Sequence, residues 1–238
     1  MMNNCEWLHH QLEVLPLFRY HFRLQDLPNN GIYFFYENGE TCRHNKQSPR
    51  IVRIGTHRNN NFRNRINDHY LLNETKMNFD IMKPAPKDRS IFRKNLGRAL
   101  LNKYKDNYLN VWEIDFTPRG NRERYNNIRD VLKEKEIENE ITNLLRKNFS
   151  FRLLIMENQD ERLGTKGIES SLIVTVARCK TCEPSSEWLG SYSPIKKIVT
   201  SGLWQTQHLS SPEINEYEQK DILKSIQNTQ EWIRRNNI

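Results

Sequence analysis

The topology of this chain can be read from Gly31-Ile32-Tyr33-Phe34-Phe35-Tyr36 and, further on, Ile51-Val52-Arg53-Ile54-Gly55. Both stretches are aromatic or β-branched, which is typical of strands. Residues 37–50 between them are rich in Asn, Gly, Ser and Pro, as polar connections are. We therefore predict two strands joined by a long loop, as an antiparallel hairpin.

After Gly55 the apolar residues change to helical spacing. Helices are predicted over residues 60–72, 90–103, 128–145 (with a break near residue 135) and 213–235. Strands are predicted over residues 111–116 and 149–156. Residues 168–176 leave both interpretations open, because their spacing favours a helix and their β-branched content a strand.

The composition excludes several classes of protein. The 238 residues are enough for one large domain, or for a domain core with a small appendage, and their formal net charge is +8. The longest apolar run, Leu172 to Ala177, is far too short to cross a bilayer. Charged residues among the first twenty are unlike a signal peptide. We therefore expect a cytoplasmic protein with no membrane partner.

The positive charge is concentrated in residues 50–105, where fourteen Lys and Arg face four Asp and Glu, a net +10. Such a field attracts a polyanion such as nucleic acid, because bound phosphates release their counterions. A basic face that only keeps the protein in solution is the alternative.

The four cysteines are Cys5, Cys42, Cys179 and Cys182. They are enough for two disulfides, and the pair Cys179-x-x-Cys182 is half of a zinc site. No second CxxC or HxxxH pair follows it to complete four ligands. The favoured interpretation is reduced thiols.

Gly31-Ile32-Tyr33 and Arg53-Ile54-Gly55 resemble the two motifs of the GIY-YIG nuclease family. That family has an arginine on the helix after the second strand, commonly with a histidine four residues later, and Arg65 and His69 match both. Its later helix carries a metal-binding glutamate in the pattern Glu-x-x-Leu-Ile, which residues 168–173 resemble. The resemblance favours the helix for this segment.

The resemblance, which extends from residue 31 to about 178, implies a role for each matching residue. Tyr33 would be the base that activates water, and Arg65 the fixed cation for the charged phosphorus centre. His69 would hydrogen-bond the nucleophile or Tyr33. Glu169 would bind the cofactor, one Mg²⁺ or Mn²⁺ ion. Hydrolysis of a phosphodiester needs such a base and such positive charge.

The chain departs from the family at Arg53, which stands where a tyrosine is usual. Arginine does not act as a base at neutral pH, so Arg53 would contact phosphate or polarise Tyr33. His57, just beyond the strand, would take over part of the tyrosine's role.

Further basic residues are candidates for contact with the nucleic-acid backbone: Arg58, Arg63, Arg93, Lys94 and Arg98. The last three share a predicted helix, whose basic face could equally be only solvated. The C-terminal tail (residues 181–238) contains Trp188, Tyr192 and Trp204. These aromatic side chains could stack on bases, but packing of the tail on the sheet is favoured. The segment 90–101 and this tail resemble a bacterial subgroup of the family.

These observations predict an α/β (α+β) fold with a small antiparallel or mixed three-stranded sheet flanked by helices. Residues 1–30 are an N-terminal extension, residues 31–180 the GIY-YIG-like domain with a helical insertion at about 76–147, and residues 181–238 a loop-rich C-terminal extension packed on the core. The predicted function is a metal-dependent endonuclease acting on DNA, with RNA left open and no oligomeric state assigned. The alternatives are a non-catalytic nucleic-acid-binding module of the same fold and a protein that binds an acidic protein partner.

Overall fold

A computed structural model of the chain describes residues 2–45, 48–164 and 167–238. Within these residues the centre is one antiparallel sheet in the order β1-β4-β2-β3. The strands are β1 (Phe18–Arg19), β2 (Ile32–Thr41), β3 (Pro49–Gly55) and β4 (Phe149–Leu154). The predicted hairpin is confirmed as β2 and β3, with Tyr33 opposite Gly55.

The prediction of a three-stranded, possibly mixed sheet needs one correction. All pairings are antiparallel, and β1 adds a fourth strand at the edge beside β4. A strand of two residues is too short to show a period of two in the sequence.

The helices lie between and after the strands: α1 (Asn4–Leu12), α2 (Phe62–Tyr70), α3 (Ile91–Lys103), α4 (Leu109–Trp112), α5 (Arg119–Arg124), α6 (Val131–Asn148), α7 (Gln159–Arg162), α8 (Ile168–Ala177), α9 (Lys196–Ser201) and α10 (Glu216–Asn236). Short 3-10 turns are η1 (Leu24–Asp26), η2 (Glu74–Met77), η3 (Pro86–Asp88) and η4 (Leu189–Tyr192). In the part of the chain that the structure covers, no helix combines the length and apolarity needed to span a membrane.

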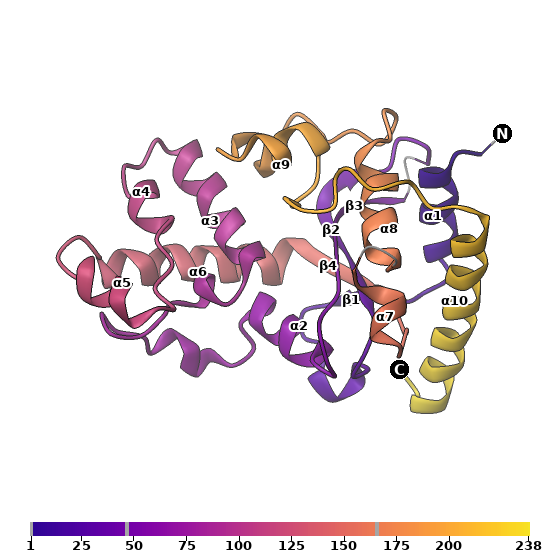
Figure 1. Cartoon of the computed structure of the whole chain (residues 1–238), viewed down its shortest axis with the longest axis horizontal. Helices are drawn as coiled ribbons and strands as arrows, with labels where there is room; N and C mark the ends of the chain where they lie inside the picture. The colour runs from indigo at the N-terminus through magenta and orange to yellow at the C-terminus, as the bar shows by residue number, and fades with distance from the viewer. Residues whose placement is uncertain (1, 46–47, 165–166) are drawn as a thin grey trace.

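Both faces of the sheet are covered, because β2 is apolar on both sides. Tyr33 and Phe35 belong to the core on one face, with side chains of α2, α3 and α6. Phe34 and Tyr36 belong to the core on the other face, with side chains of α1, α8 and α10. Figure 1 shows these two helical layers on either side of the sheet.

Two predictions from the sequence are wrong. Residues 111–116 are not a strand, because α4 ends at Trp112 and a turn follows. The indole of Trp112 is buried against Gly97 of α3 and donates to the Lys94 carbonyl at 3.0 Å. Helix α6 is continuous past Lys135. In contrast, residues 168–177 are the helix α8 that the resemblance favoured.

Helices α3 to α6 belong to residues 76–147, here called the insertion lobe, which projects from the sheet (Figure 1). Its interior contains ion pairs with fully buried side chains, Arg93 with Glu138 at 2.6 Å and Arg129 with Glu134 at 2.8 Å. Loss of one partner from such a pair costs about 3–5 kcal/mol, because the other charge is left buried.

The tail packs its tryptophans on the sheet, which is the arrangement that we favoured from the sequence. Trp188 and Trp204 are buried, and both indole groups donate to Glu37 Oε2 at 3.1 Å. Trp204 also donates its backbone N–H to the Val52 carbonyl at 2.8 Å, which holds the tail along β3. Tyr192 remains exposed.

Candidate functional site

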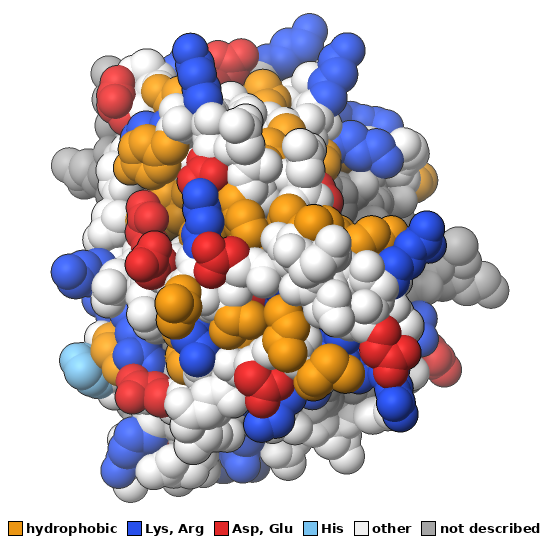
Figure 2. All heavy atoms as spheres, turned by 90° about the vertical axis from the view of Figure 1, so that its left-hand side faces the viewer, with side chains coloured by type: hydrophobic (Ala, Val, Ile, Leu, Met, Phe, Trp, Pro, Cys, Tyr) orange, Lys and Arg blue, Asp and Glu red, His pale blue; other side chains and the backbone are white. Residues whose placement is uncertain are grey.

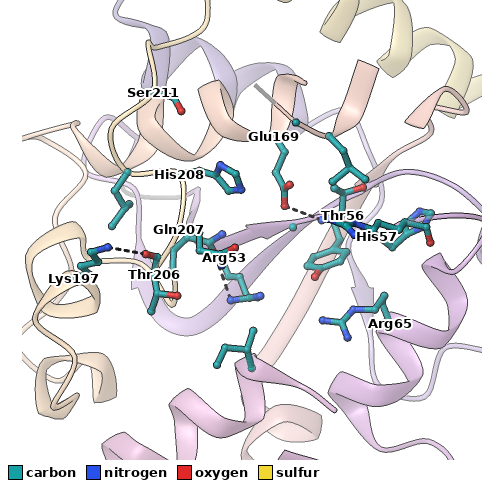
Figure 3. A pocket seen from close by; sticks show the side chains of 18 of the residues that line it. Arg53, Thr56, His57, Arg65, Glu169, Lys197, Thr206, Gln207, His208 and Ser211 are labelled. Carbon is teal, nitrogen blue, oxygen red and sulfur yellow. Dashed lines mark hydrogen bonds between the residues drawn. The ribbon is translucent and has the colours of Figure 1, made fainter. Parts of the chain in front are cut away.

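A cleft of about 990 Å³ opens beside β2, β3 and the N-terminus of α8 (Figure 3). Tyr33, Arg53, Arg65 and Glu169 line it, and they come from β2, β3, α2 and α8. Residues 205–211 of the tail line the other wall. The fold thus brings four residues that are distant in sequence to one cavity.

The two glycines of the paired motifs are required by close approaches. A Cβ atom on Gly55 would lie 2.4 Å from Tyr33 Oη, and one on Gly31 would lie 2.4 Å from the Leu154 carbonyl oxygen. Contacts this short are not tolerated between non-bonded atoms. Gly55 therefore gives the Tyr33 ring its space over β3, and Gly31 lets β2 begin against the end of β4.

His69 lies directly behind Tyr33 in the core. Tyr33 Oη is 3.0 Å from His69 Nε2, and Ser90 Oγ is 2.8 Å from His69 Nδ1. His69 is fully buried, and burial, aided by nearby guanidinium groups, lowers its pKa well below the ordinary value. The imidazole is therefore neutral at neutral pH, with one nitrogen that carries a proton and one that accepts one.

The guanidinium groups of Arg53 and Arg65 stand in the cleft without a carboxylate partner among the described residues. Arg65 Nη1 donates to the Arg89 carbonyl at 3.0 Å, which fixes its position. Arg53 is buried, lies 5.0 Å from the centre of the Phe92 ring and donates to the Trp204 carbonyl. Burial lowers the pKa of Arg53, but a guanidinium group stays protonated. Both charges are available to an anion in the cleft.

Glu169 is the carboxylate that lines this cleft, in the first turn of α8. Its Oε1 accepts the Thr56 N–H at 3.1 Å, and Oε2 has no hydrogen bond within the described residues. Burial raises the pKa of Glu169, while the charges of His208 and Arg53 oppose the rise. One carboxylate oxygen facing an open cavity suits Mg²⁺, which keeps most of its water ligands.

The sequence matches the family described as GIY-YIG domain over residues 6–232. The chain belongs to the GIY-YIG family. The family generally comprises endonucleases that are typically metal-dependent, so membership indicates a nuclease with a nucleic-acid substrate. A comparison with curated proteins and one with solved structures gave no match.

His57 of this GIY-YIG chain lines the cleft, but both ring nitrogens already contact the backbone. Nδ1 is 2.7 Å from the Asn59 carbonyl oxygen, and Nε2 accepts the Gly31 N–H at 3.2 Å. Burial lowers the pKa of His57 as well. This geometry suits a residue that positions Gly31 rather than a base that replaces the missing tyrosine.

The predicted backbone-contacting residues near the GIY-YIG motifs differ in position. Arg58 is exposed at the edge of the cleft. Arg63 donates from Nε to the Leu27 carbonyl at 2.7 Å and is partly buried.

The three predicted contacts on α3 are engaged within the insertion lobe. Arg93 is fully buried against Glu138, so the prediction that it touches nucleic acid does not fit the fold. Lys94 donates to the Glu113 carbonyl at 2.7 Å, and Arg98 pairs with the Glu113 carboxylate at 2.5 Å. Helix α3 therefore turns its basic residues toward its own lobe.

Sequence reasoning missed several residues of the site. Arg162 Nη1 donates to Thr56 Oγ1 and to the His57 carbonyl, both at 2.8 Å. Lys197 and His208 reach the cleft from the tail, and Figure 3 shows the His208 ring turned toward Glu169. No spacing in the sequence links these positions, because only the folded tail brings them to the cleft.

Proposed function

We propose that this chain is a metal-dependent endonuclease that hydrolyses phosphodiester bonds of DNA in the cleft. The observation that supports this most strongly is the 3.0 Å contact between Tyr33 Oη and His69 Nε2, in a cavity that Glu169, Arg53 and Arg65 also line. A proton acceptor, a carboxylate and unpaired cations are the groups that hydrolysis of a phosphodiester requires.

The proton path runs from the attacking water through Tyr33 to His69. With Nδ1 protonated and donating to Ser90 Oγ, His69 Nε2 accepts the hydroxyl proton of Tyr33. The tyrosine oxygen then accepts a proton from water in the cleft. Burial keeps His69 neutral in its resting state, which leaves Nε2 unprotonated in this tautomer.

Arg53 takes over an electrostatic part of the replaced tyrosine's role. Burial lowers the pKa of Arg53, and the nearby Tyr33 partly offsets this lowering. A cation at this position would stabilise the negative charge that develops at a phosphate in the cleft. Arg65, fixed by the Arg89 carbonyl, is placed for a phosphate oxygen.

Glu169 would hold the divalent metal through Oε2, while Thr56 fixes its other oxygen. The bound ion would supply positive charge to the phosphate oxygens as a Lewis acid. The cleft exposes Arg58 at its edge, where it can contact the phosphate backbone of a nucleic acid, and DNA is the nucleic acid that we propose.

The test is cleavage of plasmid DNA with Mg²⁺ or Mn²⁺. We expect Tyr33→Phe and Glu169→Ala each to lower the cleavage rate by about 10²–10⁴-fold, since each removes a group that acts in the transition state. Tyr36→Phe on the opposite face of β2 is the matched control for the first, and Glu161→Ala on α7 for the second. Cleavage of an RNA of the same sequence, with DNA left intact, would replace DNA as the substrate.

The second candidate is a nucleic-acid-binding module without catalysis. The observation that favours it is the engagement of Arg53 with Trp204 at the position where the family has tyrosine. Binding of DNA without cleavage under both metals, unchanged in Tyr33→Phe, would establish this candidate and overturn the enzyme.

A further inference from the structure

A second group of metal-binding side chains lies at the other end of α8. Glu169 is in the first turn of this helix, and Cys179 follows its last turn, roughly 15 Å away along the axis at 1.5 Å per residue. Cys5 of α1, His44 of the β2–β3 connection and Cys182 join Cys179 there. None of these residues lines the cleft.

The donor atoms form two overlapping groups that share Cys5. The donors of Cys5, His44 and Cys179 lie within 4.8 Å of one another, and those of Cys5, His9 and Cys182 form the second group at the same spacing. His44 Nε2 is 3.0 Å from Cys179 Sγ. Neighbouring ligands around a tetrahedral zinc are about 3.8 Å apart, as follows from Zn–S bonds of about 2.3 Å.

The loop after α8 has the form of a metal-binding turn. The backbone N–H groups of Cys182 and Thr181 donate to the Cys179 sulfur. Such N–H donors stabilise a thiolate, the form in which cysteine binds a metal.

His44 rather than His9 is the available imidazole. His9 Nδ1 is 2.9 Å from the Cys5 carbonyl, and His9 Nε2 accepts the Ile51 N–H at 3.2 Å, so both its nitrogens are occupied. His44 presents Nε2 to Cys179, while its Nδ1 lies 4.0 Å from Glu6 Oε2. A carboxylate behind the other nitrogen is the usual support of a zinc-bound histidine.

We propose that Cys5, His44, Cys179 and Cys182 bind one structural Zn²⁺ ion. Three thiolates and one imidazole form a closed tetrahedral set, which selects zinc over Mg²⁺ and leaves no position for a substrate. The ion joins α1, the β2–β3 connection and the end of α8, which are distant in the sequence. This site is independent of the proposed nuclease chemistry.

The test is the zinc content of the full chain, purified in reducing buffer and measured by elemental mass spectrometry. We expect about one zinc per chain, and Co²⁺ in its place should give the bands of a tetrahedral thiolate complex. Cys179→Ser and His44→Ala should lose the zinc. Cys42→Ser is the matched control, because Cys42 Sγ is 3.7 Å from Cys182 Sγ but belongs to neither group of ligands.

Two further readouts keep the test valid if a variant folds poorly. Removal of the ion from the wild type with a chelator should lower the unfolding temperature, and added Zn²⁺ should restore it. Glu169→Ala should keep its zinc, which separates this site from the cleft. Wild-type protein without zinc, a Cys42–Cys182 disulfide in it, or zinc lost from Cys42→Ser but kept in His44→Ala would overturn the proposal.

Discussion

The cleft and the insertion lobe use their arginines in opposite ways. In the lobe, Arg93 and Arg129 are each paired with a fully buried glutamate. In the cleft, Arg53 and Arg65 have no carboxylate partner among the residues described, and each donates a hydrogen bond to a backbone carbonyl group. A paired arginine stabilises one arrangement of helices, whereas an unpaired one is free to bind a phosphate. Net charge along a segment therefore does not locate a binding surface.

The surface of the lobe agrees with this distinction. Figure 2 shows Lys and Arg side chains interspersed with Asp and Glu and with hydrophobic groups, rather than one continuous basic face. Part of the positive charge of residues 50–105 is paired with acids outside that segment, as Arg50 is with Glu40 at 2.5 Å and Arg98 with Glu113 at 2.5 Å.

The largest effect on stability should come from breaking a buried pair of the lobe. Arg93→Leu leaves the Glu138 carboxylate buried without its cation, so we expect a loss of about 3–5 kcal/mol in the free energy of unfolding, measured with urea. The double variant with Glu138→Leu should recover much of this loss. A loss below about 1 kcal/mol in Arg93→Leu would show that the pair does not hold the lobe.

Glu37 is a buried carboxylate whose hydrogen bonds come from neutral indole groups. The dependence of its stability contribution on pH tests the contrast between paired and unpaired buried charges. Burial raises its pKa from 4.5 to about 7, although the indoles of Trp204 and Trp188 oppose the rise. The folded state therefore holds a proton that the unfolded chain releases above its own pKa of 4.5. The stability that Glu37 contributes is complete below pH 4.5 and is lost as the pH rises to about 7.

Glu37→Gln should remove this dependence, because glutamine still accepts both indole N–H groups. Near pH 4.5 the two proteins should be equally stable, and above pH 7 the variant should be more stable by about 3 kcal/mol, at 1.36 kcal/mol per pH unit. Urea unfolding of both proteins from pH 4.5 to 8 measures the difference, in which all other titrating groups cancel. A difference that does not change with pH would contradict the raised pKa.

The sequence predicts most accurately those elements whose secondary structure follows from their own local residue spacing. The hairpin, the family motifs and α8 follow from local spacing and from the resemblance, and the contact of Tyr33 with His69 agrees with one of the two partners predicted for His69. The misassigned strand at residues 111–116 shows the limit, because its alternating residues serve the packing of Trp112 on Gly97.

Contacts between distant segments could not be predicted. Nothing near His44 indicates that residues 5 and 179 will lie beside it, so Cys179-x-x-Cys182 looked like half a site. Likewise, nothing in residues 205–211 indicates that they cover the cleft. These neighbours depend on the packing of α1, α8 and the tail, which no local period encodes.

The smallest expected effect is on the salt dependence of DNA binding. It distinguishes an exposed arginine at the cleft from a paired arginine on the insertion lobe. Arg58 lies exposed at the cleft, whereas Arg98 is bound to Glu113. If Arg58 contacts one phosphate, Arg58→Ala should weaken DNA binding and reduce the slope of log affinity against log salt by about 1, since one fewer counterion is released. Arg98→Ala should leave that slope unchanged and cost at most about 1 kcal/mol of stability. Titrations of fluorescent duplex DNA at several salt concentrations, with Glu169→Ala in both variants to prevent cleavage, measure the slopes. Equal losses of slope would mean that the arginines of the lobe also bind DNA, and the contrast between the two regions would fail.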